Sequence, residues 1–268
     1  MDDVVYLDYN GSAPLDPRVS AVIGEVAQSF GNAAAVHIHG RMQALRLDDA
    51  REHVAELTGF RPGDVIFTAG ATEANNLALK GLTGSLESDR KRILISAVEH
   101  ASVTETAKWL QATGQASVEA IPVGPGGSIN LDALDELLTE PVGLVSVMAA
   151  NSETGVLNPI ETISERVHAS GAVLHCDATQ LLGRLPAVSG PDLLSMSSHK
   201  ICGPGGVGAL VATRNIRNRI NPVIHGGGHE QGLRSGSPNV AGVAGFGEAA
   251  RLAATDGIQD MARVEPLR

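Results

Sequence analysis

One lysine in this chain has surroundings that suit covalent chemistry. Lys200 lies within residues 195–208, Ser-Met-Ser-Ser-His-Lys-Ile-Cys-Gly-Pro-Gly-Gly-Val-Gly, between small hydroxyl residues and a glycine-rich turn. Glycine has no side chain, so a ligand or the backbone can approach the amine closely. A partly buried amine of this kind suits Schiff-base formation with a carbonyl cofactor, pyridoxal phosphate (PLP) above all. The structural alternative is an exposed lysine beside a turn.

Three more polar groups would serve a bound PLP molecule. Residues 70–72, Gly-Ala-Thr, open a predicted helix, whose free N–H groups and positive dipole end suit a phosphate. Asp177 follows a predicted strand, where its carboxylate would pair with a protonated pyridine nitrogen. His100 would stack on the ring or transfer protons. Each has a structural alternative: Thr72 as a helix cap, Asp177 as a turn former and His100 as a structural histidine.

The composition is that of an acidic globular protein with an aliphatic core. The 268 residues are 43% hydrophobic and 3% aromatic, and the formal net charge of −10 argues against binding nucleic acid. Two cysteines make no disulfide framework, so a reducing compartment is expected. With no basic-then-apolar leader and no apolar run of roughly 20 residues, we expect a cytoplasmic protein without a membrane span. His37 and His39 alone make no metal site, so no metal is expected.

Hydrophobic periodicity and turn residues predict alternating strands and helices along most of the chain. Strands are expected at residues 4–8, 65–68, 93–96, 118–123, 144–148, 172–176, 193–196 and 207–211. Helices are expected at residues 17–30, 42–58, 73–80, 131–138 and 160–167, with another that begins at residue 102. Ser102 and Glu105 have the spacing of a capping box, and Asn130 is the expected cap of the helix that follows it.

This alternation predicts a mostly parallel sheet with helices on both faces. In such sheets ligands bind beyond the carboxyl ends of the strands. Polar clusters follow the predicted strands as that rule requires, at residues 70–73, 99–100, 151–153, 177–180 and 197–200. The sequence therefore predicts that these clusters meet in one site.

Six motifs, in order along the chain, resemble those of the cysteine desulfurases, the NifS/IscS-type members of the class V aminotransferase group. They are residues 7–10 (Leu-Asp-Tyr-Asn), 70–76 (Gly-Ala-Thr-Glu-Ala-Asn-Asn), 99–100 (Glu-His), 177–180 (Asp-Ala-Thr-Gln), 198–204 (Ser-His-Lys-Ile-Cys-Gly-Pro) and 226–236 (Gly-Gly-Gly-His-Glu-Gln-Gly-Leu-Arg-Ser-Gly). The resemblance covers nearly the whole chain. It implies an α/β fold, the large domain of an aspartate aminotransferase-like, fold type I, PLP-dependent enzyme with a mostly parallel sheet.

The resemblance also implies a role for each matching position. Lys200 matches the lysine that carries PLP, His100 the histidine stacked on its ring, and Asp177 the partner of its pyridine nitrogen. The other expected cofactor contacts are Thr72, Ser197 and His199 at the phosphate, Gln180 at the phenolic oxygen, Ala71, Asn151 and Ser152, and Ser237 toward the phosphate of a neighbouring subunit.

Two departures from the family pattern bear on function. Ser152 stands where the family usually has a second asparagine, and its shorter side chain would lose the contact with the ring oxygen or make it through water. The chain ends at Arg268, where the family enters a C-terminal small domain with a nucleophilic cysteine and a carboxylate-binding arginine. Cys176 and Cys202 lie elsewhere and are expected to be structural.

The resemblance implies a homodimer that converts L-cysteine to L-alanine and passes sulfur to an enzyme thiol, then to an acceptor such as an iron–sulfur scaffold protein. We expect an N-terminal segment over residues 1–15, a PLP-binding domain over 16–255 and the start of a truncated small domain over 256–268. Without the cysteine loop, sulfur release is expected to be impaired. The alternatives are a selenocysteine lyase, an aminotransferase, or a PLP-binding subunit without turnover.

Overall fold

The structure is a computed structural model that describes residues 5–264 and 266. Its strands are β1 (Val65–Thr68), β2 (Arg92–Ser96), β3 (Ser117–Ile121), β4 (Leu144–Ser146), β5 (Val173–Asp177), β6 (Leu193–Ser197) and β7 (Gly208–Ala212). Its helices are α1 (Pro17–Ala27), α2 (Ile38–Thr58), α3 (Ala71–Thr83), α4 (Ala101–Ala112), α5 (Leu131–Leu137), α6 (Ile160–Ala169), α7 (Arg214–Arg217), α8 (Val240–Leu252) and α9 (Ile258–Val264). A π-helical turn, Ala253–Gly257, joins α8 to α9.

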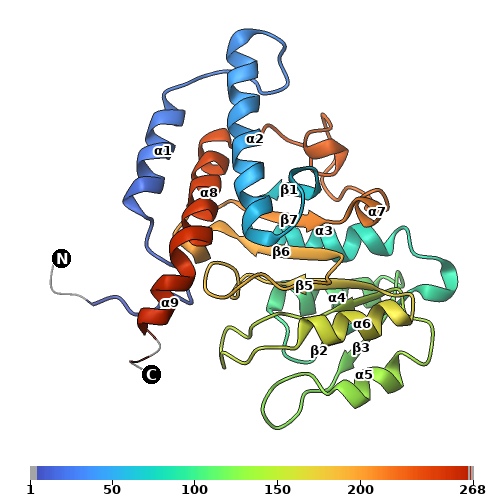
Figure 1. The fold of residues 1–268 in the computed structure, drawn as a ribbon. Helices are drawn as coiled ribbons and strands as arrows, with labels where there is room; N and C mark the ends of the chain where they lie inside the picture. The colour runs from blue at the N-terminus through green and yellow to red at the C-terminus, as the bar shows by residue number, and fades with distance from the viewer. Residues whose placement is uncertain (1–4, 265, 267–268) are drawn as a thin grey trace.

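All these strands form one sheet in the order β1-β7-β6-β5-β4-β2-β3 (Figure 1). The pairs between β3, β2, β4, β5 and β6 are parallel. β7 is antiparallel to both of its neighbours, with Gly208 opposite Thr68 and Ser197. The prediction of a mostly parallel α/β sheet is therefore confirmed. Because β7 runs antiparallel to β1 and β6, the first residues of β7 lie beside the last residues of β1 and β6.

Helices cover both faces of the sheet, so the central strands are buried on both sides. One apolar layer packs α1, α2, α5, α6 and α8 against the sheet, and the other packs α3 and α4 against the opposite face. Figure 1 shows α1, α2 and α8 gathered beside β1 and β7, with α5 and α6 toward the other end. Every residue of β5, β6 and β7 is buried, as expected for strands between two helical layers.

The strand predicted over residues 4–8 is wrong for the residues described, and residue 4 lies outside them. Residues 5–8 belong to no strand, and Val5 and Leu7 are 79% and 83% exposed. The Tyr6 hydroxyl donates to the Asp8 and Ser12 carbonyls at 2.8 and 2.9 Å, so this segment turns on itself. An apolar run without a neighbouring strand has nothing to pair with.

The capping-box prediction at Ser102 is also wrong, because α4 begins at Ala101 and His100 is its N-cap. The His100 Nδ1 atom accepts the Ser102 N–H at 3.1 Å. Ser102 lies within the first turn and is 8% exposed, so its hydroxyl faces the interior. The predicted cap of α5 is confirmed, since the Asn130 Oδ1 atom accepts the Asp132 and Ala133 N–H groups.

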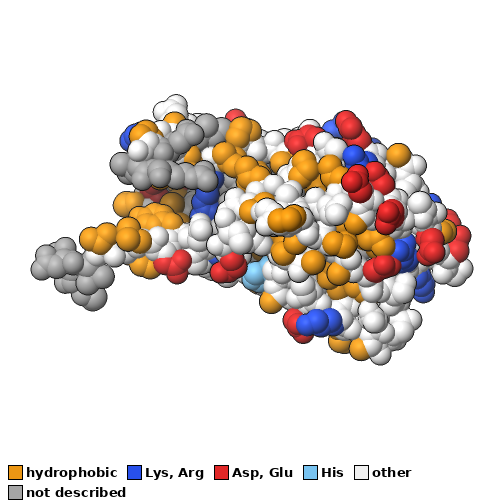
Figure 2. All heavy atoms as spheres, turned by 90° about the horizontal axis from the view of Figure 1, so that it is seen from below, with side chains coloured by type: hydrophobic (Ala, Val, Ile, Leu, Met, Phe, Trp, Pro, Cys, Tyr) orange, Lys and Arg blue, Asp and Glu red, His pale blue; other side chains and the backbone are white. Residues whose placement is uncertain are grey.

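Within the described part of the chain, no helix combines the length and the apolar character needed to cross a bilayer. Figure 2 shows acidic and basic side chains interspersed over one face of the molecule. That face therefore has no field of basic side chains that would attract a polyanion.

Candidate active site

The polar clusters predicted to meet do meet, in a cavity of about 990 Å³ at the carboxyl ends of the parallel strands. Its lining includes nine of the predicted cofactor contacts, together with Thr179. The nine are Ala71, Thr72, His100, Ser152, Asp177, Gln180, Ser197, His199 and Lys200. Each comes from the end of a strand, or from the loop or first helical turn that follows it. The rule that ligands bind beyond the carboxyl ends of parallel strands therefore holds here.

Lys200 lies on a 3₁₀ turn, Ser198–Ile201, that directly follows β6. Its Nζ atom donates to the Asn10 carbonyl and to the Gly11 carbonyl, the latter at 2.9 Å. Burial, followed by the charge of Arg184, lowers the pKa of the Lys200 amine from its ordinary value. A larger fraction of the amine is therefore neutral and nucleophilic than for a solvated lysine.

Asp177 ends β5 and is 5% exposed, with its carboxylate held by two donors. The Asn75 Nδ2 atom of α3 donates to Oδ2 at 2.8 Å, and the Thr179 N–H donates to Oδ1 at 3.0 Å. These bonds fix a carboxylate at the cavity wall. Such a carboxylate suits a cationic ring nitrogen. The bond from the Thr179 N–H is a turn contact, so Asp177 also shapes the turn that follows β5.

His100 borders the cavity as the N-cap of α4, and its Nδ1 atom already has partners within the chain. The Nδ1 atom lies 2.8 Å from the Ser102 hydroxyl and accepts the Ser102 N–H. A neutral His100 ring therefore carries its proton on Nε2. The Nε2–H group is then the part of the ring that remains for a ligand.

The start of α3 forms a cradle of the kind that holds a phosphate. Gly70 is the N-cap, with φ of 148°, and provides no side chain to cap the first amides. Thr72 is thus the second residue of the helix, and the alternative that it merely caps α3 is excluded. Ser197 and His199 also border the cavity, and the Ser197 Oγ atom lies 3.7 Å from where a Cβ atom on Gly70 would be. A Cβ atom on the neighbouring Gly208 would lie 2.7 Å from Gly70 backbone atoms, so only glycine allows this close approach.

Other predicted contacts have partners within the chain. The Gln180 Nε2 atom donates to the Asn10 carbonyl, and its Oε1 atom accepts from Arg184 at 2.6 Å. The Asn151 Oδ1 atom accepts the N–H groups of Glu153 and Thr154, which shapes its own loop, while Ser152 borders the cavity. Ser237 is exposed and does not border this cavity.

No role was expected from the sequence for Asn75, Arg184 or the backbone of residues 10–11. Asn75 and Asn10 stand inside motifs that carry the family resemblance, and this was the available signal. Arg184 had none, since an arginine after a predicted strand is ordinary. The residues present fit PLP: an amine, a fixed carboxylate, an imidazole and an uncapped helix start line one cavity.

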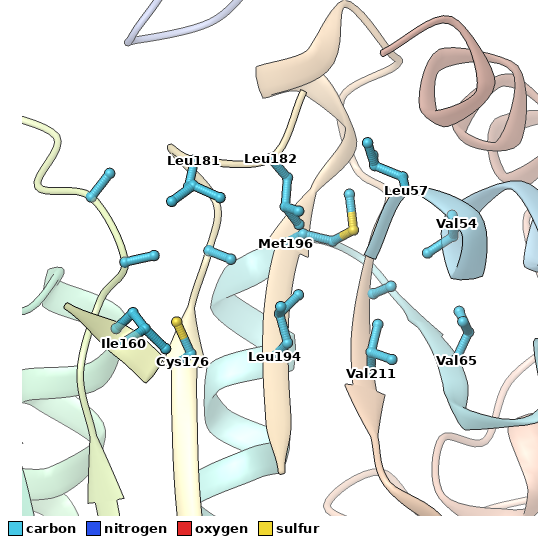
Figure 3. Close-up of a cluster of buried hydrophobic side chains, with 14 of the residues drawn as sticks. Val54, Leu57, Val65, Ile160, Cys176, Leu181, Leu182, Leu194, Met196 and Val211 are labelled. Carbon is cyan, nitrogen blue, oxygen red and sulfur yellow. The ribbon is translucent and has the colours of Figure 1, made fainter. Parts of the chain in front are cut away.

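Neither cysteine is among the described residues that line the cavity. Cys176 is fully buried in the apolar layer that contains Ile160, on the face of β5 opposite to Asp177 (Figure 3). Burial raises the pKa of the Cys176 thiol well above its ordinary value. Cys202 ends the turn that holds Lys200, with φ of 61°, and burial raises the pKa of its thiol too. Both thiols are thus poorly ionised and held in place.

A second histidine, His175, is fully buried two residues before Asp177. Its Nδ1 atom lies 2.8 Å from the Ser146 hydroxyl and its Nε2 atom 2.9 Å from the Ser195 hydroxyl. Burial lowers the pKa of His175 from 6.5 to about 4. The unfolded chain therefore takes up a proton near pH 6.5, while the folded chain resists protonation until about pH 4.

We expect the His175 contribution to stability to be complete above pH 6.5 and to be lost as the pH falls to about 4. The loss should be about 3 kcal/mol in the free energy of unfolding. Urea unfolding across this range should show a shallower pH slope for His175→Gln than for the unsubstituted chain. The exposed His225→Gln is the matched control and should keep the original slope. An unchanged slope in His175→Gln would contradict a neutral buried imidazole.

Comparison with known proteins shows which family this chain belongs to. Residues 5–266 match the Aminotransferase class-V family model. The chain is 42% identical over 275 residues to the cysteine desulfurase of Frankia sp. (strain EuIK1), covering 98% of this chain and 66% of that protein. A solved NifS-like protein superposes with a TM-score of 0.94 at 35% identity, covering 98% of this chain and 73% of that one. The structure of SspA in complex with cysteine superposes with a TM-score of 0.87 at 33% identity, covering 92% and 72%.

The fold and the family match together define a fold type I, class V aminotransferase architecture, and the chain belongs to the class-V aminotransferase family. Within that family it resembles the cysteine desulfurases of the NifS/IscS type. It spans about two thirds of the length of the curated relatives that it matches, 66% for the Frankia protein.

Proposed function

We propose that this chain binds PLP through Lys200 and serves the cysteine desulfurase reaction. In that reaction L-cysteine and a thiol give L-alanine and a persulfide, so the sulfur atom moves from the substrate to the thiol. The observation that carries the proposal is the placement of Lys200, Asp177, His100 and the start of α3 around one cavity. Cysteine is the proposed substrate because the curated relatives are cysteine desulfurases and a structural neighbour was solved with cysteine.

Each residue has a separate task in this proposal. When bound, PLP supplies an electron sink for negative charge at the substrate Cα. Asp177 holds a proton at the pyridine nitrogen, and the N–H groups that begin α3 bind the phosphate with Thr72, Ser197 and His199. The Lys200 amine attaches the cofactor and, when free, accepts the Cα proton. His100 presents its Nε2–H group to the ring or the substrate.

Two further parts of the proposal concern other molecules. Ser237, which is exposed and outside the cavity, is proposed to reach the phosphate of a second subunit in a homodimer. The thiol that receives sulfur is proposed to lie outside these 268 residues, since Cys176 is buried and Cys202 borders no part of the cavity. An iron–sulfur scaffold protein is the proposed final acceptor.

The proposal is tested by finding the residue to which the cofactor binds. The chain should be mixed with PLP, reduced with borohydride, digested and examined by mass spectrometry. The expected result is an added pyridoxyl phosphate mass on the peptide that contains Lys200. An adduct on another lysine, or none, would overturn the proposal.

Thr72→Ala should weaken PLP binding severalfold without unfolding the chain. The variant loses one hydroxyl donor to the phosphate but keeps the helix dipole and the backbone N–H groups, which contribute about 0.3–1 kcal/mol or more. Titration of PLP absorbance gives the dissociation constant. Thr104→Ala, at a half-buried position in α4 outside the cavity, is the control and should bind as the unsubstituted chain does. Equal affinities for Thr72→Ala and the control would show that the phosphate lies elsewhere.

A further inference from the structure

An unbroken row of hydrogen-bonded side chains links Asp177 to His100 behind the cavity wall. The Asn75 Nδ2 atom donates to Asp177 Oδ2 and lies 2.8 Å from the Ser102 hydroxyl. The Ser102 hydroxyl lies 2.8 Å from His100 Nδ1. Asn75 is fully buried, and Ser102 and Asp177 are 8% and 5% exposed. The row therefore joins α3, the start of α4 and the end of β5 through side chains that are mostly shielded from water.

The donors and acceptors in this row allow one arrangement. A carboxylate oxygen only accepts, so the Asn75 amide must turn its nitrogen toward Asp177. The second hydrogen of that nitrogen goes to the Ser102 oxygen. The hydroxyl hydrogen of Ser102 is then free to point at His100 Nδ1, which leaves the ring proton of His100 on Nε2.

Fold stability alone does not explain an asparagine at this position. The Asn75 Oδ1 atom is buried and is among the described side-chain atoms that have no hydrogen-bond partner. Such an atom lowers stability, because it leaves water without gaining a replacement bond. A leucine here would have a similar volume and no unsatisfied oxygen. We therefore look for the role of Asn75 in the two groups to which its Nδ2 atom donates, the Asp177 carboxylate and the Ser102 hydroxyl.

We propose that Asn75 is a positioning residue that orients both Asp177 and His100 toward the cofactor. Its amide holds the Asp177 carboxylate in the direction of the ring nitrogen, and through Ser102 it holds the imidazole of His100 with Nε2–H toward the cavity. This inference rests on the proposed function, since it assigns a purpose to the two residues that flank the proposed PLP ring.

The test compares Asn75→Leu with a matched control on the same helix. Thr83→Val also removes a buried hydrogen bond of α3, from the Thr83 hydroxyl to the Leu79 carbonyl, but at the end of the helix that is remote from the cavity. Asn75→Leu should raise the PLP dissociation constant roughly tenfold, the effect of a lost hydrogen bond to a charged group. Thr83→Val should leave that constant unchanged.

A second measurement follows His100 without any cofactor. The ¹⁵N chemical shifts of an imidazole distinguish an Nε2–H ring from an Nδ1–H ring, and the unsubstituted chain should show Nε2–H. Asn75→Leu and Ser102→Ala should both shift the His100 signals, while Thr83→Val should not. Ser102→Ala should raise the PLP dissociation constant less than Asn75→Leu, because it leaves the bond to Asp177 in place.

Both measurements must change in Asn75→Leu, and an unchanged value in either one overturns the proposal. If that variant does not fold, Asn75→Asp replaces it with a side chain of the same shape. A carboxylate facing Asp177 should weaken PLP binding more than tenfold, and unchanged binding would overturn the proposal. An unsubstituted chain that takes up no PLP would instead overturn the proposed function, and the His100 signals alone would then decide the role of Asn75.

Discussion

Replacing Lys200 by alanine should abolish the covalent attachment of PLP. The Lys200 amine borders the cavity, and burial lowers its pKa, so it is the side chain that supplies a neutral amine at this place. Alanine leaves the phosphate cradle and Asp177 intact but provides no nitrogen. We therefore expect PLP to bind reversibly and to wash out on dialysis, with no borohydride-fixed adduct. The rate of Cα proton exchange should fall by at least about 10³-fold at the same time, as is usual when a covalent catalytic group is removed.

The matched control is another lysine with no connection to the cavity. Lys108 lies on α4, and its Nζ atom pairs with Glu105 at 2.6 Å in an exposed position. Lys108→Ala should keep the full borohydride adduct. Free methylamine added to Lys200→Ala should restore part of the Cα proton exchange, because it replaces the missing amine. A full adduct in Lys200→Ala would show that another residue holds the cofactor.

The second large effect concerns sulfur release. The 268-residue chain, supplied with PLP and L-cysteine, should form alanine at least about 10³-fold more slowly than a desulfurase with a mobile thiol in its site. The physical reason is the placement of its two cysteines. Cys176 is fully buried in one of the two apolar layers that cover the sheet, and Cys202 ends the short turn that carries Lys200. Neither reaches a sulfur atom held in the cavity, and burial keeps both thiols protonated.

The assay measures alanine and sulfide from cysteine in the presence of a reductant. Cys202→Ser should leave the small residual rate unchanged, because the thiol takes no part in it. The same preparation should still exchange the Cα proton of cysteine or alanine with solvent deuterium, which separates the proton-transfer steps from sulfur transfer. A fast desulfurase rate that Cys202→Ser abolishes would identify Cys202 as the nucleophile.

Features that depend on local spacing could be predicted from the amino-acid sequence. Short apolar runs that alternate with helical patterns predicted an α/β sheet. The polar clusters that follow those runs predicted one site at the carboxyl ends of the strands. The glycines and hydroxyl residues around Lys200 pointed to a covalent amine, and Asn130 was recognised as a helix cap from its position. The sheet, the common cavity and the Asn130 cap are confirmed, because strand alternation and helix capping involve residues only a few positions apart. The covalent amine at Lys200 stays a prediction.

Contacts between groups far apart in the sequence become visible only in the folded chain. The carbonyls of residues 10 and 11 accept from the Lys200 amine across about 190 positions, and Asn75 donates to Asp177 across 102. The sequence also did not predict that Cys176 is the fully buried cysteine or that β7 runs antiparallel to its neighbours. A sequence records the neighbours along the chain, whereas these contacts arise because the strand order β1-β7-β6-β5-β4-β2-β3 brings the ends of remote strands to one edge. That order is fixed by how the two apolar layers pack, which is a property of the whole fold.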